Sequence, residues 1–208
     1  MDYLNIAIAK GRIGKDTSNM FKKIGLGDSL DLDSRKLIFK DEKNKIKFIY
    51  VKSADVVTYV QNGVADLGVV GKDVILESDT DVYEIYDLGF GRCKFAIAGK
   101  RHQKIYLKDQ ILKVATKYPK IAEQYFNEKN QKIKVIKLNG SVELAPLVGL
   151  SDVIVDIVET GNTLKANGLE VIEEMFYISA RLICNRVSYR FKYNRIANLL
   201  ESLRGVGQ

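Results

Sequence analysis

The residues best suited to chemistry lie in one short stretch, positions 156–164 with the sequence DIVETGNTL. It joins an apolar run and two carboxylates to a Thr-Gly-x-Thr turn, followed by the first residues of an expected helix. Glycine lets a backbone approach an anion closely, and the free N–H groups of a helix start point towards that anion. The hydroxyls of Thr160 and Thr163 add two donors. One interpretation of the stretch is therefore a phosphate site, where the helix end contributes about 0.3–1 kcal/mol.

The two acids of this stretch need another partner. Asp156 and Glu159 would repel a phosphate unless they face ribose hydroxyls or a Mg²⁺ ion. The alternative interpretation is a plain strand-to-helix turn with Thr and Asn as capping residues. Spacing alone leaves these two interpretations equally supported.

Short apolar runs alternate with stretches of helical spacing along the chain. We expect strands at residues 4–9, 36–39, 46–51, 67–70, 83–88, 93–98, 114–116, 133–138 and 153–158. We expect helices at residues 15–24, 53–62, 121–129, 162–167 and 188–203, with short ones after Gly71 and Ser141. Strands that alternate with helices indicate an α/β fold built on a doubly wound parallel sheet.

Composition narrows the function classes. The chain has 208 residues, enough for one large or two small domains, and two cysteines and one histidine are too few for a disulfide framework or a Cys/His zinc site. His102 lies in a polar stretch and is expected in a solvated loop. The net charge of +7 favours polyanionic ligands. Because acids and bases alternate through most of the chain, phosphorylated metabolites are favoured over nucleic acid.

No part of the sequence suggests a membrane or an export route. The N-terminus has no basic region before its apolar run, and no run approaches the roughly 18 apolar residues of a membrane span. Cys93 and Cys184 are expected to be buried free thiols, so the cytoplasm is the expected compartment.

Several motifs occur in order over nearly the whole chain. They are KGR at 10–12, ADLGVVGKD at 65–73, DLGFGR at 87–92, IKLNGSVELAPLVGL at 136–150, DIVETG at 156–161 and ISARL at 178–182. In this order they resemble the ATP phosphoribosyltransferase family, which begins histidine biosynthesis. The length resembles the short form of the family, which lacks a C-terminal regulatory domain.

The resemblance implies a fold and a reaction. The fold would be α/β with two doubly wound lobes similar to type II periplasmic binding proteins, residues 1–88 plus 178–208 and residues 89–177, with the active site in the cleft. The family transfers the 5-phosphoribosyl group of 5-phosphoribosyl 1-diphosphate (PRPP) to N1 of ATP and releases pyrophosphate. Mg²⁺ is the implied cofactor, held mainly through substrate phosphates. The implied partner is a histidyl-tRNA-synthetase-like regulatory subunit, with a homodimer of this chain inside a hetero-octamer.

The resemblance also assigns residues by position. Asp156 and Glu159 would meet ribose hydroxyls or Mg²⁺, and the 5′-phosphate would be held by Thr160, Gly161, Asn162, Thr163 and Leu164. The nucleotide or pyrophosphate would face Lys10, Arg12, Arg35 and Lys52. Candidates for ATP contacts or for cleft structure are Asp66, Lys72, Asp73, Arg92, Asn139, Ser141 and Glu143.

One position departs from the family pattern, and one competing function stays open. Lys52 stands where the family more often carries an arginine, so the charge is kept without the planar bidentate contact. A small-anion-binding cleft protein without catalysis is the alternative function. Asp156 and Glu159 argue against it, because a simple anion receptor gains nothing from two carboxylates beside its ligand.

Overall fold

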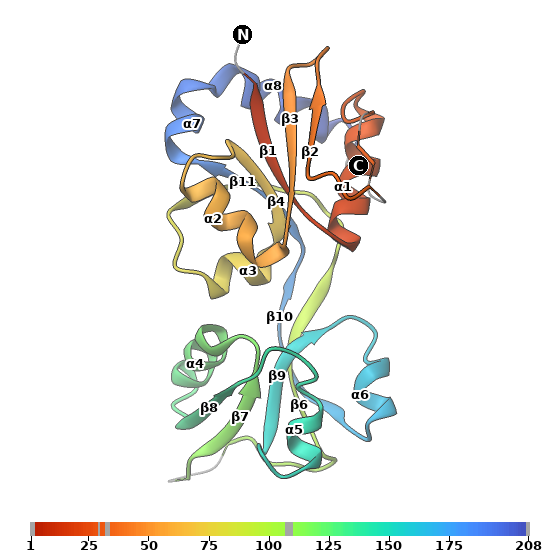
Figure 1. Cartoon of the computed structure of the whole chain (residues 1–208). Coiled ribbons are helices and arrows are strands. Elements are labelled where there is room, and N and C mark those ends of the chain that lie inside the picture. Colours follow the sequence, from red (N-terminus) through yellow and green to blue (C-terminus); the bar gives the residue numbers. More distant parts are fainter. Residues whose placement is uncertain (1–2, 29, 32–33, 107–109, 207–208) are drawn as a thin grey trace. The chain divides into compact units, whose positions relative to one another are not determined.

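The protein is an α/β fold of two compact units (Figure 1). The computed structural model describes residues 3–28, 30–31, 34–106 and 110–206. Unit 1 comprises Met1–Gly91 with Ser179–Gln208, and unit 2 comprises Arg92–Ile178. Each unit has its own sheet and its own core, so the expected α/β class with two lobes is confirmed.

Unit 1 is built on a six-stranded sheet in the order β2-β3-β1-β4-β11-β5. The strands are β1 (Leu4–Ala9), β2 (Ile38–Asp41), β3 (Ile46–Val51), β4 (Leu67–Gly71), β5 (Val82–Asp87) and β11 (Ala180–Asn185). β1 runs parallel to β3 and β4, whereas β2, β11 and β5 run antiparallel to their neighbours. The sheet is therefore mixed, with its parallel strands at the centre.

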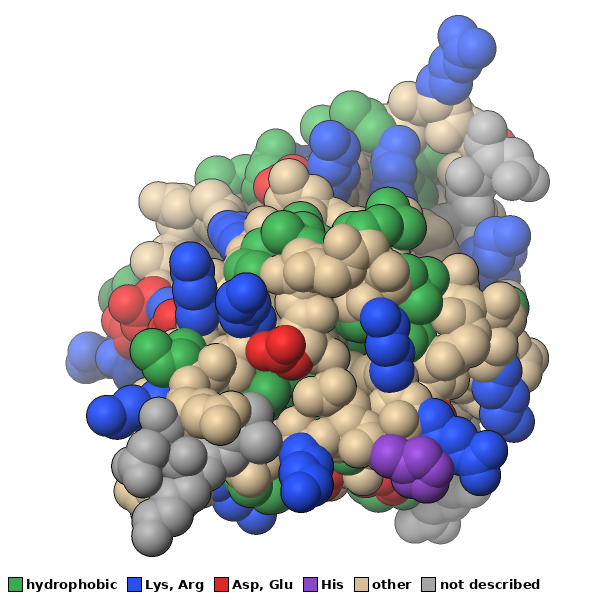
Figure 2. Space-filling model, turned by 90° about the horizontal axis from the view of Figure 1, so that it is seen from below, with side chains coloured by type: hydrophobic (Ala, Val, Ile, Leu, Met, Phe, Trp, Pro, Cys, Tyr) green, Lys and Arg blue, Asp and Glu red, His purple; other side chains and the backbone are tan. Residues whose placement is uncertain are grey.

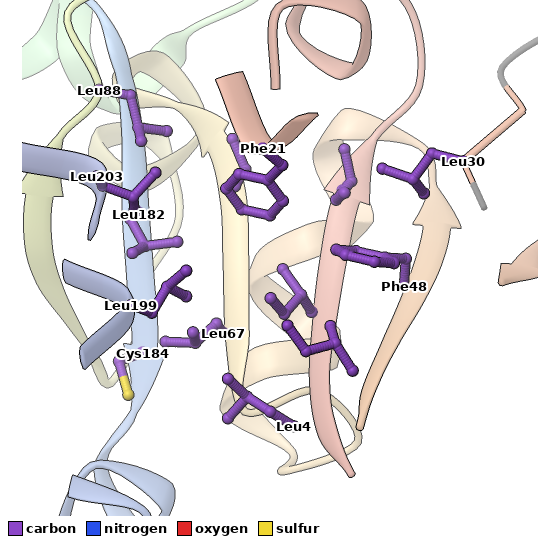
Figure 3. Packing of buried hydrophobic residues seen from close by; sticks show 14 of the residues in the cluster. Leu4, Phe21, Leu30, Phe48, Leu67, Leu88, Leu182, Cys184, Leu199 and Leu203 are labelled. Carbon is purple, nitrogen blue, oxygen red and sulfur yellow. The ribbon is translucent and has the colours of Figure 1, made fainter. Parts of the chain in front are cut away.

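Helices cover both faces of this sheet. They are α1 (Arg12–Lys23), a 3₁₀ turn (Ser53–Asp55), α2 (Val56–Gln61), α3 (Lys72–Glu77), α7 (Arg186–Phe191) and α8 (Tyr193–Arg204). On one face Phe21 of α1 and Leu199 of α8 pack with strand residues such as Phe48 (Figure 3). On the other face, Val56 and Val60 of α2 form a second apolar cluster. A sheet buried on both faces explains why β1, β3 and β4 read as short apolar runs.

Unit 2 has a five-stranded sheet in the order β10-β6-β9-β7-β8. Its strands are β6 (Cys93–Gly99), β7 (Leu112–Thr116), β8 (Ile133–Lys137), β9 (Val153–Val158) and β10 (Glu170–Ile178). Its helices are α4 (Pro119–Glu128), α5 (Leu144–Leu147) and α6 (Asn162–Ala166). β7 runs parallel to β8 and β9, while β6 runs antiparallel to β9 and β10. This sheet is also mixed.

The expected elements differ from the observed ones at a few places. The helix expected at 53–62 begins with a 3₁₀ turn, and no side chain caps it. The single helix expected at 188–203 is two helices, α7 and α8, separated at Lys192. The Asn185 side chain caps α7 by accepting hydrogen bonds from the N–H groups of Val187 and Ser188. The alternation of strands and helices predicted a parallel sheet. The observed pairing is parallel among β3, β1 and β4 and among β9, β7 and β8, whereas β2, β11 and β6 run in the opposite direction within their sheets.

No helix within the described ranges is long and apolar enough to cross a membrane.

Candidate active site

In unit 2 the turn after β9 has the geometry of an anion site. Gly161 has φ +74° and ψ 5°, a left-handed conformation that glycine adopts without the strain of a Cβ atom. The first helical hydrogen bond runs from the Lys165 N–H to the Gly161 carbonyl at 3.1 Å. The Thr160 hydroxyl oxygen accepts a long hydrogen bond from the Asn162 N–H at 3.4 Å. The turn thus places Thr160 at the start of a helix, where backbone N–H groups face outwards.

A hollow of about 200 Å³ opens beside this turn. It is lined by Lys94, Val158, Glu159, Thr160, Gly161, Leu164, Lys165, Leu169, Glu170 and Val171. Leu164 is buried in the core with Leu169 and anchors α6. Thr160, Asn162 and Thr163 are exposed. The hollow therefore has an apolar floor and a polar rim that carries two cations and two acids.

Lys94 and Lys165 are site residues that the sequence interpretation did not include. Lys94 lies on β6 and forms an ion pair with Glu174 on β10. The hydrogen bond from the Lys94 ammonium to Glu174 raises the pKa of Lys94, so the ammonium keeps its charge. Lys165 comes four residues after Gly161, one helical turn from the start of α6. This spacing could have indicated in the sequence that Lys165 lies near the turn.

Asp156 lies within β9 and Glu159 just beyond its end. Ile154 and Val158 pack in the cluster that contains Leu164, so strand alternation places Asp156 on the same face of the sheet as α6. Asp156 is half-buried, and its Oδ1 accepts the Ile157 N–H at 2.8 Å. Glu159 is exposed and lines the hollow. One carboxylate is thus fixed in the strand and the other is turned towards solvent.

Other expected site residues of unit 2 lie at the same edge of its sheet. β7, β8 and β9 are parallel, so the loop after β8 that carries Asn139 and Ser141 lies at the edge where β9 ends. β6 runs antiparallel to β9 with Lys94 opposite Val158, which brings the preceding Arg92 to this edge too. Asn139, Ser141 and Arg92 are exposed. Glu143, half-buried, is the N-cap residue of α5 in the same loop.

Unit 1 gathers cations at the carboxyl edge of its own sheet. β1 and β3 are parallel with Ala9 opposite Val51, so the residues that follow them, Lys10 and Lys52, are neighbours. The Lys10 N–H donates to the Val51 carbonyl at 2.9 Å. Both lysine side chains are exposed.

Arg12 and Arg35 extend this group of cations. Gly11, with φ +96° and ψ −148°, turns the chain from β1 into α1, whose first residue is Arg12. Arg35 precedes β2, which is antiparallel to β3, and the Tyr50 N–H donates to the Leu37 carbonyl at 2.8 Å. Arg35 therefore lies towards the edge where β3 ends. We call Lys10, Arg12, Arg35 and Lys52 the cationic edge.

Lys72 and Asp73 follow β4, which is parallel to β1 with Val69 opposite Ile8. They therefore lie at the same carboxyl edge. The Lys72 ammonium is paired with Glu84 of β5. Asp73 folds back over Gly71, where an added Cβ would lie 2.1 Å from its Oδ1. Gly71 thus leaves room for the first turn of α3.

Asp66 is the expected site residue that the structure does not bring to this group. It precedes β4 and lies at the opposite edge of the sheet, beside Asn5. It is 4% exposed, and its carboxylate accepts hydrogen bonds from Lys192 at 2.7 Å, Ser188 at 2.6 Å and the Asn5 N–H at 2.8 Å. Both carboxylate oxygens are therefore engaged in holding α7 and α8 against β1 and β4.

The remaining reactive groups add no second centre to the described part of the chain. No three His, Cys, Asp or Glu side chains gather there as a metal site. Neither Cys93 nor Cys184 forms a disulfide. Cys184 is buried as expected, and burial raises its pKa to about 12, whereas Cys93 is only half-buried. His102 is exposed in a turn, as expected. On the face shown in Figure 2, lysine and arginine side chains are spread widely and acidic ones are few, so the positive charge does not form a single stripe there.

Comparison with known proteins agrees with the motif pattern. The family model of HisG, ATP phosphoribosyltransferase, matches residues 52–205. A protein named ATP phosphoribosyltransferase from Clostridioides difficile is 70% identical over 200 residues, 96% of each chain. One of the same name from Caldanaerobacter subterraneus subsp. tengcongensis is 52% identical over 210 residues, covering 99% of this chain and 98% of the relative.

Comparison with solved structures finds a member of the same family and a more distant protein that shares the fold. The ATP phosphoribosyl transferase (HisG:HisZ) complex from Thermotoga maritima contains a chain with a TM-score of 0.84 and 36% identity, and 98% of each chain is covered. The periplasmic aliphatic sulphonate binding protein SsuA from Escherichia coli has a TM-score of 0.64 at 13% identity, over 100% of this chain and 73% of that one. The second likeness shows the fold alone. The near-complete coverage at high identity, with the motifs in place, shows that this chain belongs to the ATP phosphoribosyltransferase family.

Proposed function

We propose that this chain transfers the 5-phosphoribosyl group of PRPP to N1 of ATP, giving phosphoribosyl-ATP and pyrophosphate in the first step of histidine biosynthesis. The observation that carries the proposal is the turn after β9, where Gly161 in a left-handed conformation joins two carboxylates to a helix start beside an open hollow. Family membership supplies the reaction.

The turn suits the 5′-phosphate and ribose of PRPP. We propose that the backbone N–H groups of Asn162 to Leu164 and the hydroxyls of Thr160 and Thr163 bind the 5′-phosphate. Lys94 and Lys165 add positive charge at the rim of the hollow. Asp156 and Glu159, on the β9 side, accept hydrogen bonds from ribose hydroxyls.

The cationic edge suits the second polyanion and the leaving group. When N1 of ATP attacks the anomeric carbon, the bond from that carbon to the pyrophosphate oxygen breaks and its electrons leave with pyrophosphate. The protein's contribution is to align the two substrates and to stabilise charge on pyrophosphate. We propose that Lys10, Arg12, Arg35 and Lys52 make those contacts. Lys52 acts as a point charge, because an ammonium cannot make the planar two-bond contact of a guanidinium.

We assign the second group of candidates by position. Arg92, Asn139, Ser141 and Glu143 share a sheet edge with the PRPP turn, and Lys72 with Asp73 shares one with the cationic edge. We propose that these residues contact ATP or shape its site. We leave Asp66 out of the proposed site, because its carboxylate is already satisfied by α7, α8 and β1.

Family members use a metal cofactor, and we propose that the metal here is Mg²⁺. The described residues offer the two carboxylates Asp156 and Glu159 and no cluster of three, which fits an ion held mainly by substrate phosphates. When bound, Mg²⁺ would neutralise charge on the pyrophosphate of PRPP.

We also propose that this chain works with a regulatory protein subunit. The Thermotoga maritima relative was solved as a HisG:HisZ complex. By that likeness this chain would work with a histidyl-tRNA-synthetase-like regulatory subunit, as a homodimer inside a hetero-octamer.

The proposed lobes are residues 1–88 plus 178–208 and residues 89–177, with the PRPP turn in the second. Because ATP and PRPP are intracellular metabolites, the cytoplasm is the proposed compartment.

PRPP binding tests the assignment of the turn. Calorimetric titration of PRPP into Thr163→Ala should show affinity about tenfold weaker, since one hydroxyl donor to a charged phosphate is lost. Thr58→Ala is the matched control, because Thr58 is an exposed threonine on α2 of unit 1. Equal affinity of the Thr163→Ala variant and the unaltered chain would place the phosphate elsewhere.

A further inference from the structure

A group of charged residues at the ends of β5 and β11 has no place in the reaction as described so far. Arg181, the second residue of β11, lies opposite Asp87, the last residue of β5. Its Nη2 lies 3.1 Å from Asp87 Oδ2, and its Nη1 lies 3.3 Å from Glu84 Oε1. One guanidinium thus bridges two carboxylates on the same strand.

Glu84 is shared with Lys72. Its Oε2 pairs with the Lys72 ammonium while its Oε1 faces Arg181. The result is a chain of alternating charges, in the order Lys72, Glu84, Arg181 and Asp87. Lys72 is thereby connected to the other members through a single carboxylate.

The backbone of Lys72 is attached to the same group. Its N–H donates to the Ser179 carbonyl at 3.0 Å, and the Ser179 hydroxyl donates to Asp87 Oδ1 at 2.7 Å. The same Oδ1 accepts the Gly89 N–H at 2.9 Å. Both the main chain and the side chain of Lys72 are therefore held by groups that Asp87 and Arg181 organise.

Partial burial of three of the four members makes this arrangement more rigid than an exposed pair, although the Asp87 side chain is 48% exposed. The side chains of Lys72 and Glu84 are each 26% exposed, and that of Arg181 is 22% exposed. Hydrogen bonds gain strength where water is partly excluded, and a network fixes its members more tightly than separate pairs do. A guanidinium can serve two carboxylates at once because its donors form a planar fork, which a lysine lacks.

We infer that Arg181 is a positioning residue for the proposed reaction: held by Asp87, it balances the charge of Glu84 so that the Lys72 ammonium can meet the phosphates of ATP. The inference rests on the proposed function. Arg181 balances much of the charge of Glu84, so Lys72 remains available to a substrate phosphate. Without Arg181, the full charge of Glu84 competes with the phosphate for Lys72.

The test is steady-state kinetics on the full chain with its regulatory subunit, varying ATP and PRPP separately. Arg181→Met should raise KM for ATP about tenfold and leave KM for PRPP within twofold of the unaltered chain. Adding Glu84→Gln to Arg181→Met should restore KM for ATP to within about threefold, because the competing carboxylate is gone. Lys72→Met should raise KM for ATP, and adding Arg181→Met to it should raise KM no further.

Arg186→Met is the matched control. Arg186 pairs with Asp81 at 2.9 Å between the other ends of the same two strands, and this pair is more exposed. Its loss should change neither KM. Should Arg181→Met fail to fold, as judged by its thermal unfolding, Arg181→Lys carries the test, with a rise in KM for ATP alone, because an ammonium cannot serve Glu84 and Asp87 at once.

Two results would overturn the inference: an unchanged KM for ATP, or equal increases in both KM values with no recovery on adding Glu84→Gln. The second result would mark the group as merely structural. Absence of product from the unaltered chain and its partner would instead refute the proposed function, so the two failures are distinguishable.

Discussion

Replacing Gly161 by alanine should weaken PRPP binding more than it lowers the free energy of unfolding. Gly161 has φ +74°, and an alanine Cβ there would meet only a Val158 methyl group at 3.8 Å, an ordinary contact. Steric clash is therefore absent, and the cost is the left-handed conformation, about 1–2 kcal/mol for a residue with a Cβ. Alanine also restricts the unfolded chain, which returns about 0.4–1 kcal/mol. We expect the free energy of unfolding to fall by about 0–1.6 kcal/mol.

The effect on PRPP is larger because the turn can relieve its strain by leaving the left-handed conformation. Binding must then restore the turn at a cost of about 1–2 kcal/mol, which lowers the affinity for PRPP about 5- to 30-fold. Calorimetric titration measures the affinity, and urea unfolding measures the stability.

Gly149→Ala provides the matched control. Gly149 lies in the same unit with φ +75° and has no atom within 4 Å of an added Cβ. It should lose similar stability and retain PRPP affinity. If both variants weakened PRPP equally, or if neither did, the assignment of the phosphate to the turn at Gly161 would be refuted.

Three further predictions concern stability, each measured by urea unfolding. Lys192→Met removes the ammonium that pairs with the buried Asp66 carboxylate, and should lower the free energy of unfolding by about 2–4 kcal/mol; a loss below 0.5 kcal/mol would contradict the role given to this pair. Gly68→Ala places a methyl group 2.7 Å from a valine of α2 and should cost about 1–3 kcal/mol, whereas an unchanged midpoint would show that α2 can shift. Burial, together with the hydrogen bond to Glu173, raises the pKa of Tyr125 to about 12, so its contribution is present below pH 10 and is lost as pH rises through 12. Tyr125→Phe should therefore lose less stability than the unaltered chain between pH 10 and 12, and equal losses would exclude the effect.

The central strands could be predicted from the sequence because their burial leaves a local signature. β1 and β9 are short apolar runs ended by polar or glycine residues, and the structure places them at residues 4–9 and 153–158 as expected. The turn at Gly161 could also be predicted, since a glycine between two threonines after such a run marks a tight strand-to-helix connection.

Features that depend on distant contacts could not be predicted in this way. The apolar residues Ile196, Leu199 and Leu203 follow helical spacing, and the sequence predicts one helix that begins at Ser188. The chain instead forms two helices, separated at Lys192. The Lys192 ammonium reaches Asp66 and the Tyr3 carbonyl, contacts across more than 120 residues of sequence.

The position of Asp66 and the group around Arg181 depend on the same kind of long-range contact. Asp66 and Arg181 belong to the motifs at 65–73 and 178–182, but a motif does not show which distant side chains a residue contacts. Asp66 turned out to lie at the sheet edge opposite Lys10, because it precedes a strand that Lys72 follows. Strand order and register, which place Arg181 beside Asp87, come only from the folded sheet.

Product formation tests the central claim most directly. The purified chain, mixed with ATP, PRPP and Mg²⁺ with and without its regulatory subunit, should release pyrophosphate and form an ultraviolet-absorbing phosphoribosyl-ATP in equal amounts. Omission of either substrate should abolish both products. If PRPP and ATP bound while neither product formed, even with the regulatory subunit present, the chain would be a binding protein and the proposed transferase activity would be wrong.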